Sequence, residues 1–122
     1  MKGEKLYHSD LEVYKLAMDF VVDIYMLTKS FPHDEQFGLV SQMRRCVISI
    51  PSNIAEGCAR LSDKETGRFI SIANGSVAEL ETQLIIAHRL GYVDNIEHML
   101  VKIKKISALI VGLKKFLDKS VL

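Results

Sequence analysis

Residues 39–60, LVSQMRRCVISIPSNIAEGCAR, decide the fold of this chain. Apolar side chains recur here at the three- and four-residue spacing of one helix face, which predicts an amphipathic helix over about residues 36–58. Pro51 stands inside this pattern, where a proline removes one backbone hydrogen bond and tends to kink the helix. We therefore expect a kinked helix in which the carbonyl of Val47 needs a donor from elsewhere.

The other side of this helix carries a polar stripe. Its members are Arg45, Ser49, Ser52, Asn53 and Glu56. Three interpretations remain open: a polar seam that fixes the register between helices, a groove that binds a peptide or a phosphate, and a plain solvated face. We favour the seam, because the serine and asparagine side chains can donate to a carbonyl that the proline frees.

The remaining sequence predicts three more helices, over about residues 10–30, 63–90 and 94–118. Residues 1–9 are expected to form a flexible arm. Short turns between four helices are typical of an up-down-up-down bundle. The predicted fold is therefore all-α, a single antiparallel four-helix-bundle domain over residues 1–122.

Cap residues and apolar stripes support these helices. Ser62 and Glu65 match the capping box at the start of the third helix. The other expected caps are Ser9 or Asp10, Asp94 or Asn95, and Gly91 at a helix end. The expected core face of the third helix is Phe69, Ile72, Ala73, Ser76, Val77, Leu80, Leu84 and Ala87. That of the fourth helix is Ile96, Met99, Ile103, Ile106, Ile110, Leu113 and Leu117.

The first helix has more apolar surface than a small bundle can bury. Only Glu12, Asp19 and Asp23 form a clearly polar stripe on it. A helix with so wide an apolar face must contact more than one neighbour, so we expect part of it to meet another subunit. The candidate oligomer interface comprises Tyr14, Met18, Val21, Val22 and Tyr25.

Composition narrows the class of protein. A chain with 48% hydrophobic and 25% charged residues is balanced like a globular protein, and a net charge of +1 gives no overall attraction to nucleic acid or membrane. No apolar run approaches the roughly 20 residues that span a bilayer, and the N-terminus lacks the apolar core of a signal peptide. Cys46 and Cys58 lie about 18 Å apart on one helix, too far for a disulfide. Reduced thiols and a cytoplasmic location are expected.

The sequence contains no recognisable catalytic or metal-binding arrangement. Glu-x-x-His pairs, paired zinc ligands, phosphate-binding loops and the GxSxG elbow are all missing. Neither cysteine has a visible partner base. We predict that the protein is not an enzyme, has no cofactor and has no small-molecule substrate.

Basic residues form the second candidate site. Lysines gather on the outer side of the fourth helix, and further cations flank the turn between the second and third helices. These candidates for nucleic-acid binding are Lys104, Lys105, Lys115, Lys119, Arg44, Arg60, Lys64 and Arg68. Three interpretations compete: a solvated face, contacts with the acidic stripe of a neighbouring subunit, and a basic band for RNA or DNA phosphates.

Two blocks of the sequence are specific enough to indicate a family. Residues 49–57, SIPSNIAEG, and residues 75–81, GSVAELE, resemble the four helix bundle proteins whose founding members are encoded by intervening sequences in bacterial 23S ribosomal RNA genes. The opening HSDLEVYKLAMDFVVDIYMLTKSFP also fits, so the resemblance covers about residues 9–118.

The resemblance implies a small bacterial cytoplasmic protein that assembles as a homo-oligomeric ring, with pentamers known in the family, and it implies no enzymatic activity and no cofactor. A distant branch is similar to the accessory protein of diversity-generating retroelements, a basic pentamer that binds nucleic acid, whereas this chain is nearly neutral. We expect a non-enzymatic oligomer, a pentamer of identical chains, that assists RNA, DNA or a ribonucleoprotein. The alternative is a purely protein-binding or structural oligomer without nucleic-acid contact.

Overall fold

A computed structural model describes residues 6–121, and the side chains of residues 6–119. Its elements in chain order are η1 (His8–Asp10), α1 (Glu12–Thr28), η2 (His33–Glu35), α2 (Leu39–Cys58), α3 (Asp63–Arg89) and α4 (Glu97–Val121), where η denotes a 3-10 turn. The described residues contain no strand, and the predicted all-α class is confirmed. Part of the expected arm, residues 1–5, lies outside the described residues.

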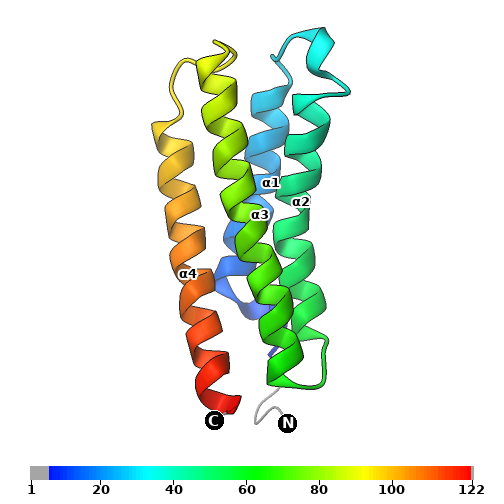
Figure 1. The fold of residues 1–122 in the computed structure, drawn as a ribbon, viewed down its shortest axis with the longest axis vertical. Helices are drawn as coiled ribbons and strands as arrows, with labels where there is room; N and C mark the ends of the chain where they lie inside the picture. The colour runs from blue at the N-terminus through cyan, green and yellow to red at the C-terminus, as the bar shows by residue number, and fades with distance from the viewer. Residues whose placement is uncertain (1–5, 122) are drawn as a thin grey trace.

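The four long helices lie side by side along the long axis of the molecule, and successive helices run in opposite directions (Figure 1). Each helix packs on the next in the chain, and α1 also contacts α4. The α2–α3 contact is the most extensive of these and the α1–α4 contact the least. The α1–α2 and α3–α4 loops lie at one end of the bundle, whereas the α2–α3 turn lies at the other end with the last turns of α4 (Figure 1).

The core fills the space between the helices with aliphatic side chains. The stripe predicted for α4 is confirmed: all of its members are buried except Leu113, which is half-buried. The apolar stripe expected on α2 is buried at Met43, Cys46, Val47, Ile50 and Ile54 and half-buried at Leu39, and Val40 is buried beside it. The largest fully buried side chains include Phe20, Ile24, Met43, Ile50, Ile54, Ile70, Leu80, Leu84, Ile106, Ile110 and Leu117.

The prediction for α3 is wrong in its first half. Ile72 is 49% exposed, whereas Ile70 is completely buried. The residues that face the core are spaced alternately by three and four, which is the pattern of a narrow bundle seam. Phe69 stands beside that line and is half-buried, because it lies against Gly57 of α2.

Helix ends show which caps form. Ser62 Oγ accepts a hydrogen bond from the Glu65 amide at 3.2 Å, as the capping box predicts. Asn95 Oδ1 accepts from the Glu97 amide at 2.9 Å, and Gly91 adopts a positive φ of 81° after α3. The caps predicted for the first helix are wrong. Residues 8–10 form the separate turn η1, so α1 begins after Leu11 without a side-chain cap.

Candidate functional site

The α2 polar stripe makes one direct contact with another helix. Ser49 Oγ lies 2.7 Å from Ser76 Oγ of α3 in a hydrogen bond, and 2.5 Å from the Cys46 carbonyl. Asn53 Nδ2 donates to the Ser49 carbonyl at 2.8 Å, within its own helix. Ser49 therefore connects α2 to α3, whereas the Asn53 side chain makes its hydrogen bond within α2.

The other three members of the stripe are exposed. They are Arg45, Ser52 and Glu56. Glu56 forms an ion pair with Arg60 one turn later, at 3.0 Å. The polar stripe thus joins α2 to α3 through the Ser49–Ser76 pair within this chain, Asn53 bonds within α2, and Arg45, Ser52 and Glu56 are exposed.

Cys46 lies at the same helix contact and is not a poised nucleophile. Its thiol is buried and lies 3.1 Å from the Ser76 carbonyl, to which it donates. Burial, followed by the negative charge of Glu79, raises the pKa of the Cys46 thiol to about 12. Because the thiolate is the reactive form, this cysteine is inert near neutral pH. Cys58 is also buried, and neither cysteine is in a disulfide.

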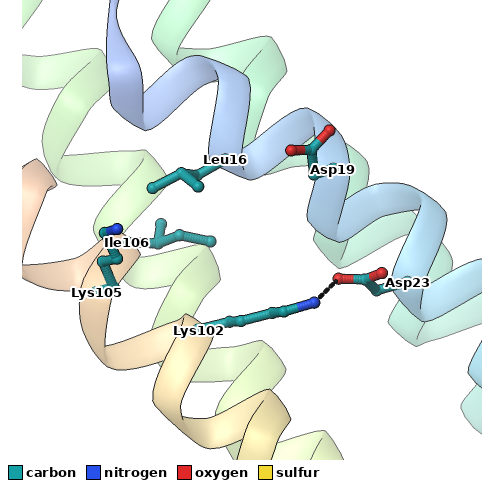
Figure 2. A pocket seen from close by; sticks show the side chains of 6 residues that line it. All are labelled: Leu16, Asp19, Asp23, Lys102, Lys105 and Ile106. Atoms are coloured by element: carbon teal, nitrogen blue, oxygen red, sulfur yellow. Dashed lines mark hydrogen bonds and ion pairs between the residues drawn. The ribbon is translucent and has the colours of Figure 1, made fainter.

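Acidic residues of α1 meet lysines of α4 within the same chain (Figure 2). Lys102 Nζ lies 2.6 Å from Asp23 Oδ2, and Lys105 Nζ lies 3.7 Å from Glu12 Oε1. The sequence alone left open a contact between the lysines and the acids of another subunit. Within this chain, Lys105 already has a carboxylate of its own α1 within reach. Asp19 lines the small cavity beside these pairs (Figure 2).

The remaining lysines of the stripe face away from α1. Lys104, Lys115 and Lys119 are exposed, and none of the three forms an ion pair with another described residue. A helix turns by about 100° per residue, so Lys104 and Lys115 lie within about 20° of each other around the axis, about 16 Å apart along it. Lys119 lies one turn further on. These three residues, the outer lysine face, form a row along α4.

Two cations of α3 lie near the C-terminal end of this row. Lys114 of α4 sits over Gly67, since its Nζ would be 3.3 Å from a Cβ at that glycine. This contact places the last turns of α4 beside the first turns of α3, where Lys64 and Arg68 are exposed. Lys115 also lines a cavity of about 250 Å³ between α3 and α4. The structure therefore brings part of the predicted basic band to one end of the bundle.

Two arginines assigned to the band lie differently. Arg44 is near the start of α2, at the opposite end of the bundle, and it donates to Thr28 and to the Tyr25 carbonyl of α1. Arg60 stacks over the ring of Phe69 at 4.5 Å and pairs with Glu56. Both are half-buried and engaged by their own chain, so we exclude them from the basic surface.

The candidate oligomer interface forms a partly open apolar surface. Met18 is 46% exposed and Val22 61% exposed, whereas Tyr14, Val21 and Tyr25 are half-buried. A groove of about 280 Å³ runs between α1 and α2 along this surface. It is lined by Tyr14, Met18, Val21, Ile48, Pro51, Ser52 and Ala55. Pro51, inside α2, thus lines the groove.

Sequence reasoning missed several contacts that organise the surface. Lys102 was not singled out, although it lies three residues before Lys105 and therefore on the same side of the helix. Glu35 binds the Leu39 amide at 3.2 Å and the Tyr92 hydroxyl at 2.8 Å, so it joins the two loops at one end of the bundle. The acids of α1 were a usable signal for Lys102. No signal in the sequence pointed to the Glu35–Tyr92 pair, because its two residues lie 57 positions apart in the chain.

Comparison with known proteins identifies a family. A family model described as 23S rRNA-intervening sequence protein matches residues 9–112 of the chain. No curated protein matches it significantly. Among residues 6–121, no three or more metal-ligating side chains are grouped as a metal site would need. No helix in that range has the length and apolar character to cross a membrane.

Proposed function

The chain belongs to the 23S rRNA-intervening sequence protein family, and from this premise we propose that it is a non-enzymatic, cytoplasmic homo-oligomer that binds RNA or DNA. The outer lysine face of α4 is the contact surface. Lys64 and Arg68 extend it at one end. The protein acts as an accessory to nucleic acid or to a ribonucleoprotein, with affinity that depends on charge rather than on base sequence.

The observation that carries this proposal is the division of the lysines on α4. Lys102 and Lys105 form exposed ion pairs with acids of α1, whereas Lys104, Lys115 and Lys119 have no such partner among the described residues. Lysines that are exposed and unpaired are available to replace the counterions of a phosphate backbone. In a ring of identical chains this row would be repeated, which compensates for the small net charge of one chain.

Assembly into a ring, with five copies as the proposed number, uses the apolar groove between α1 and α2. Met18 and Ile48 are exposed along it, and Val22, one helical turn after Met18, extends an apolar patch of the kind that marks protein contacts. The groove lies on different helices from the outer lysine face. One chain can therefore contact its neighbour and nucleic acid at the same time.

The alternative is a structural oligomer without nucleic-acid contact. It is favoured by the same apolar groove, which needs a protein partner whether or not RNA binds. On this alternative the outer lysines serve only to keep the assembly soluble. The two functions agree on the oligomer and differ only in what α4 does.

The salt dependence of RNA binding tests the proposal. The triple variant Lys104→Gln, Lys115→Gln, Lys119→Gln removes the unpaired charges, and the double variant Lys102→Gln, Lys105→Gln is its control on the same helix. We expect the logarithm of the RNA affinity to fall linearly with the logarithm of salt concentration, with a slope smaller by about 2 to 3 in the triple variant. The double variant should stay near wild type. Equal slopes for the triple variant and wild type would leave the structural oligomer as the function.

The oligomer is tested separately. Met18→Glu places a charge in the α1–α2 groove, and Val101→Glu places one on an exposed site of α4. Light scattering should show dissociation of the Met18 variant and an unchanged mass for the Val101 variant, because desolvating an unpaired charge in an interface is costly. A wild-type protein that is monomeric across a dilution series would contradict this part of the proposal.

A further inference from the structure

A second polar site lies at the loop end of the bundle, away from the outer lysine face. It is a cavity of about 260 Å³ between the end of α1 and the start of α2. Its polar lining consists of Thr28, Lys29, His33, Gln36 and Arg44. The proposed function does not use it.

Arg44 is held in place at this cavity. Its Nε donates to Thr28 Oγ1 at 3.0 Å, one terminal nitrogen donates to the Tyr25 carbonyl at 3.3 Å, and the guanidinium stacks over the Tyr25 ring at 4.5 Å. Thr28 is itself buried and donates to the Ile24 carbonyl at 2.8 Å. An arginine has five N–H donors, so these two bonds leave three of them. The guanidinium is thus a preorganised cation whose remaining N–H donors are available to a ligand.

The charge around the cavity is positive. Lys29 and His33 are exposed at its edge, and no carboxylate lines it among the described residues. Glu35 lies close in sequence, but its two oxygens are engaged by the Leu39 amide and the Tyr92 hydroxyl. One anchored cation, Arg44, together with the exposed Lys29 and His33 therefore lines one small polar space.

We propose that this cavity binds a phosphate group. A rigid guanidinium fork matches the oxygens of a phosphate, and a neighbouring lysine adds a second positive charge without competing for the same geometry. Gln36 supplies a neutral side chain with N–H donors at the wall, whereas the Thr28 hydroxyl is engaged by the Ile24 carbonyl and by Arg44 and serves to hold Arg44 in place. At about 260 Å³ the cavity lies just below the range of about 300–1,000 Å³ usual for sites that enclose a drug-sized ligand, so it has room for a phosphate group.

The group has two possible sources, a free phosphate compound or the terminal phosphate of a nucleic-acid strand. Titrations followed by phosphorus NMR distinguish them with three probes: inorganic phosphate, a short single strand with a 5′-phosphate, and the same strand with a 5′-hydroxyl. A 5′-phosphorylated strand that binds more tightly than both other probes identifies a strand end. Equal binding of inorganic phosphate and the phosphorylated strand identifies a free phosphate compound. Both results support the phosphate site.

Matched variants locate the binding. Arg44→Gln removes the anchored fork, and Arg45→Gln changes the next residue, which is exposed and does not line the cavity. Because Arg44 also bonds to the end of α1, the double variant Lys29→Gln, His33→Gln provides a second test at exposed positions. We expect phosphate affinity to fall about tenfold or more in each cavity variant, as for the loss of one charge-assisted hydrogen bond. Arg45→Gln should bind like wild type.

Phosphate binding that is undetectable in the wild type would overturn the proposal. So would a folded double variant that binds phosphate as tightly as the wild type. This outcome is separate from that of the outer lysine face, since the cavity lies between α1 and α2, the lysine face lies on α4, and the two sites share no residue.

Discussion

Two helix contacts in this bundle are built in opposite ways. Where α2 meets α3, the joining groups are short: Thr66 Oγ1 donates to the Gly57 carbonyl at 2.8 Å, and Ser49 bonds Ser76. Where α1 meets α4, long charged side chains bridge the helices around a cavity of about 110 Å³. The first contact is extensive and close, and the second is sparse and rimmed by ion pairs (Figure 2).

The difference shows where this fold gains its stability and where it leaves room for function. Short side chains bring two backbones together, so their contact tolerates little change in volume. Exposed ion pairs contribute little to stability and can be exchanged for other partners. We infer that the α2–α3 contact fixes the architecture, whereas charges on α4 can be altered without unfolding the protein.

The largest expected effect is at Gly57. A Cβ there would lie 2.9 Å from Phe69 Cβ and 3.1 Å from the Thr66 carbonyl oxygen, whereas one at Gly75 would meet nothing within 4 Å. Gly57→Ala should therefore lose about 1–3 kcal/mol of unfolding free energy through overpacking. Gly75→Ala should instead gain about 0.5–1 kcal/mol, since alanine favours the helix. Denaturant unfolding measures both, and a stabilised Gly57→Ala protein would contradict the close α2–α3 contact.

A smaller effect is expected at Ser76. Ser76→Ala removes the hydroxyl that bonds Ser49, at a cost of about 1 kcal/mol. The control is Ser71→Ala on the exposed side of α3, which should change stability by less than about 0.5 kcal/mol. Equal unfolding midpoints for the two variants would show that the Ser49–Ser76 hydrogen bond does not stabilise the α2–α3 contact.

The Cys46 thiol reports how closed this contact is. Because its pKa is raised to about 12, from 9.0, the unfolded chain ionises first as the pH rises. The buried neutral thiol therefore adds to the free energy of unfolding fully below pH 9, and this stabilisation is lost as the pH rises from 9 to 12. In a Cys58→Ala background at pH 8, alkylation of the folded protein should be far slower than that of the unfolded chain. Similar rates would mean that the contact opens readily.

The smallest effect is expected at the α1–α4 contact. Lys102→Gln breaks a 2.6 Å ion pair with Asp23, but both side chains are partly exposed. Its loss should cost no more than about 1 kcal/mol and should be undetectable at high salt. A loss as large as that of Gly57→Ala would show that the two contacts differ less than their geometry indicates.

Much of the fold could be predicted from local sequence. The apolar spacing of α2 and α4 and the Ser62 cap follow from neighbours along one helix, and these predictions are confirmed. The rotation of α3 could not be predicted, because adjacent apolar residues at 69, 70, 72 and 73 allow two stripes one residue apart. In the structure Gly57 of α2 lies against both Phe69 and Ile70, and the helix is turned so that Ile70 is the buried one.

The candidate site was less accessible to sequence reasoning. The lysines on α4 form one row in a helical projection, yet only the position of α1 separates the paired Lys105 from the unpaired Lys104. Arg44 lies 16 residues before Arg60 on the same predicted helix, and a rise of about 1.5 Å per residue puts them about 24 Å apart. The sequence alone therefore indicated that these two arginines belong to different surfaces.

The most direct test of the central claim compares RNA affinity and melting temperature in two proteins. One is Gly57→Ala, and the other is the triple variant Lys104→Gln, Lys115→Gln, Lys119→Gln. With binding measured well below both melting temperatures, we predict that Gly57→Ala melts several degrees lower but binds RNA like wild type. The triple variant should melt like wild type and lose most of its RNA affinity. A triple variant that keeps its RNA affinity while Gly57→Ala loses it would contradict the separation of fold and function described above.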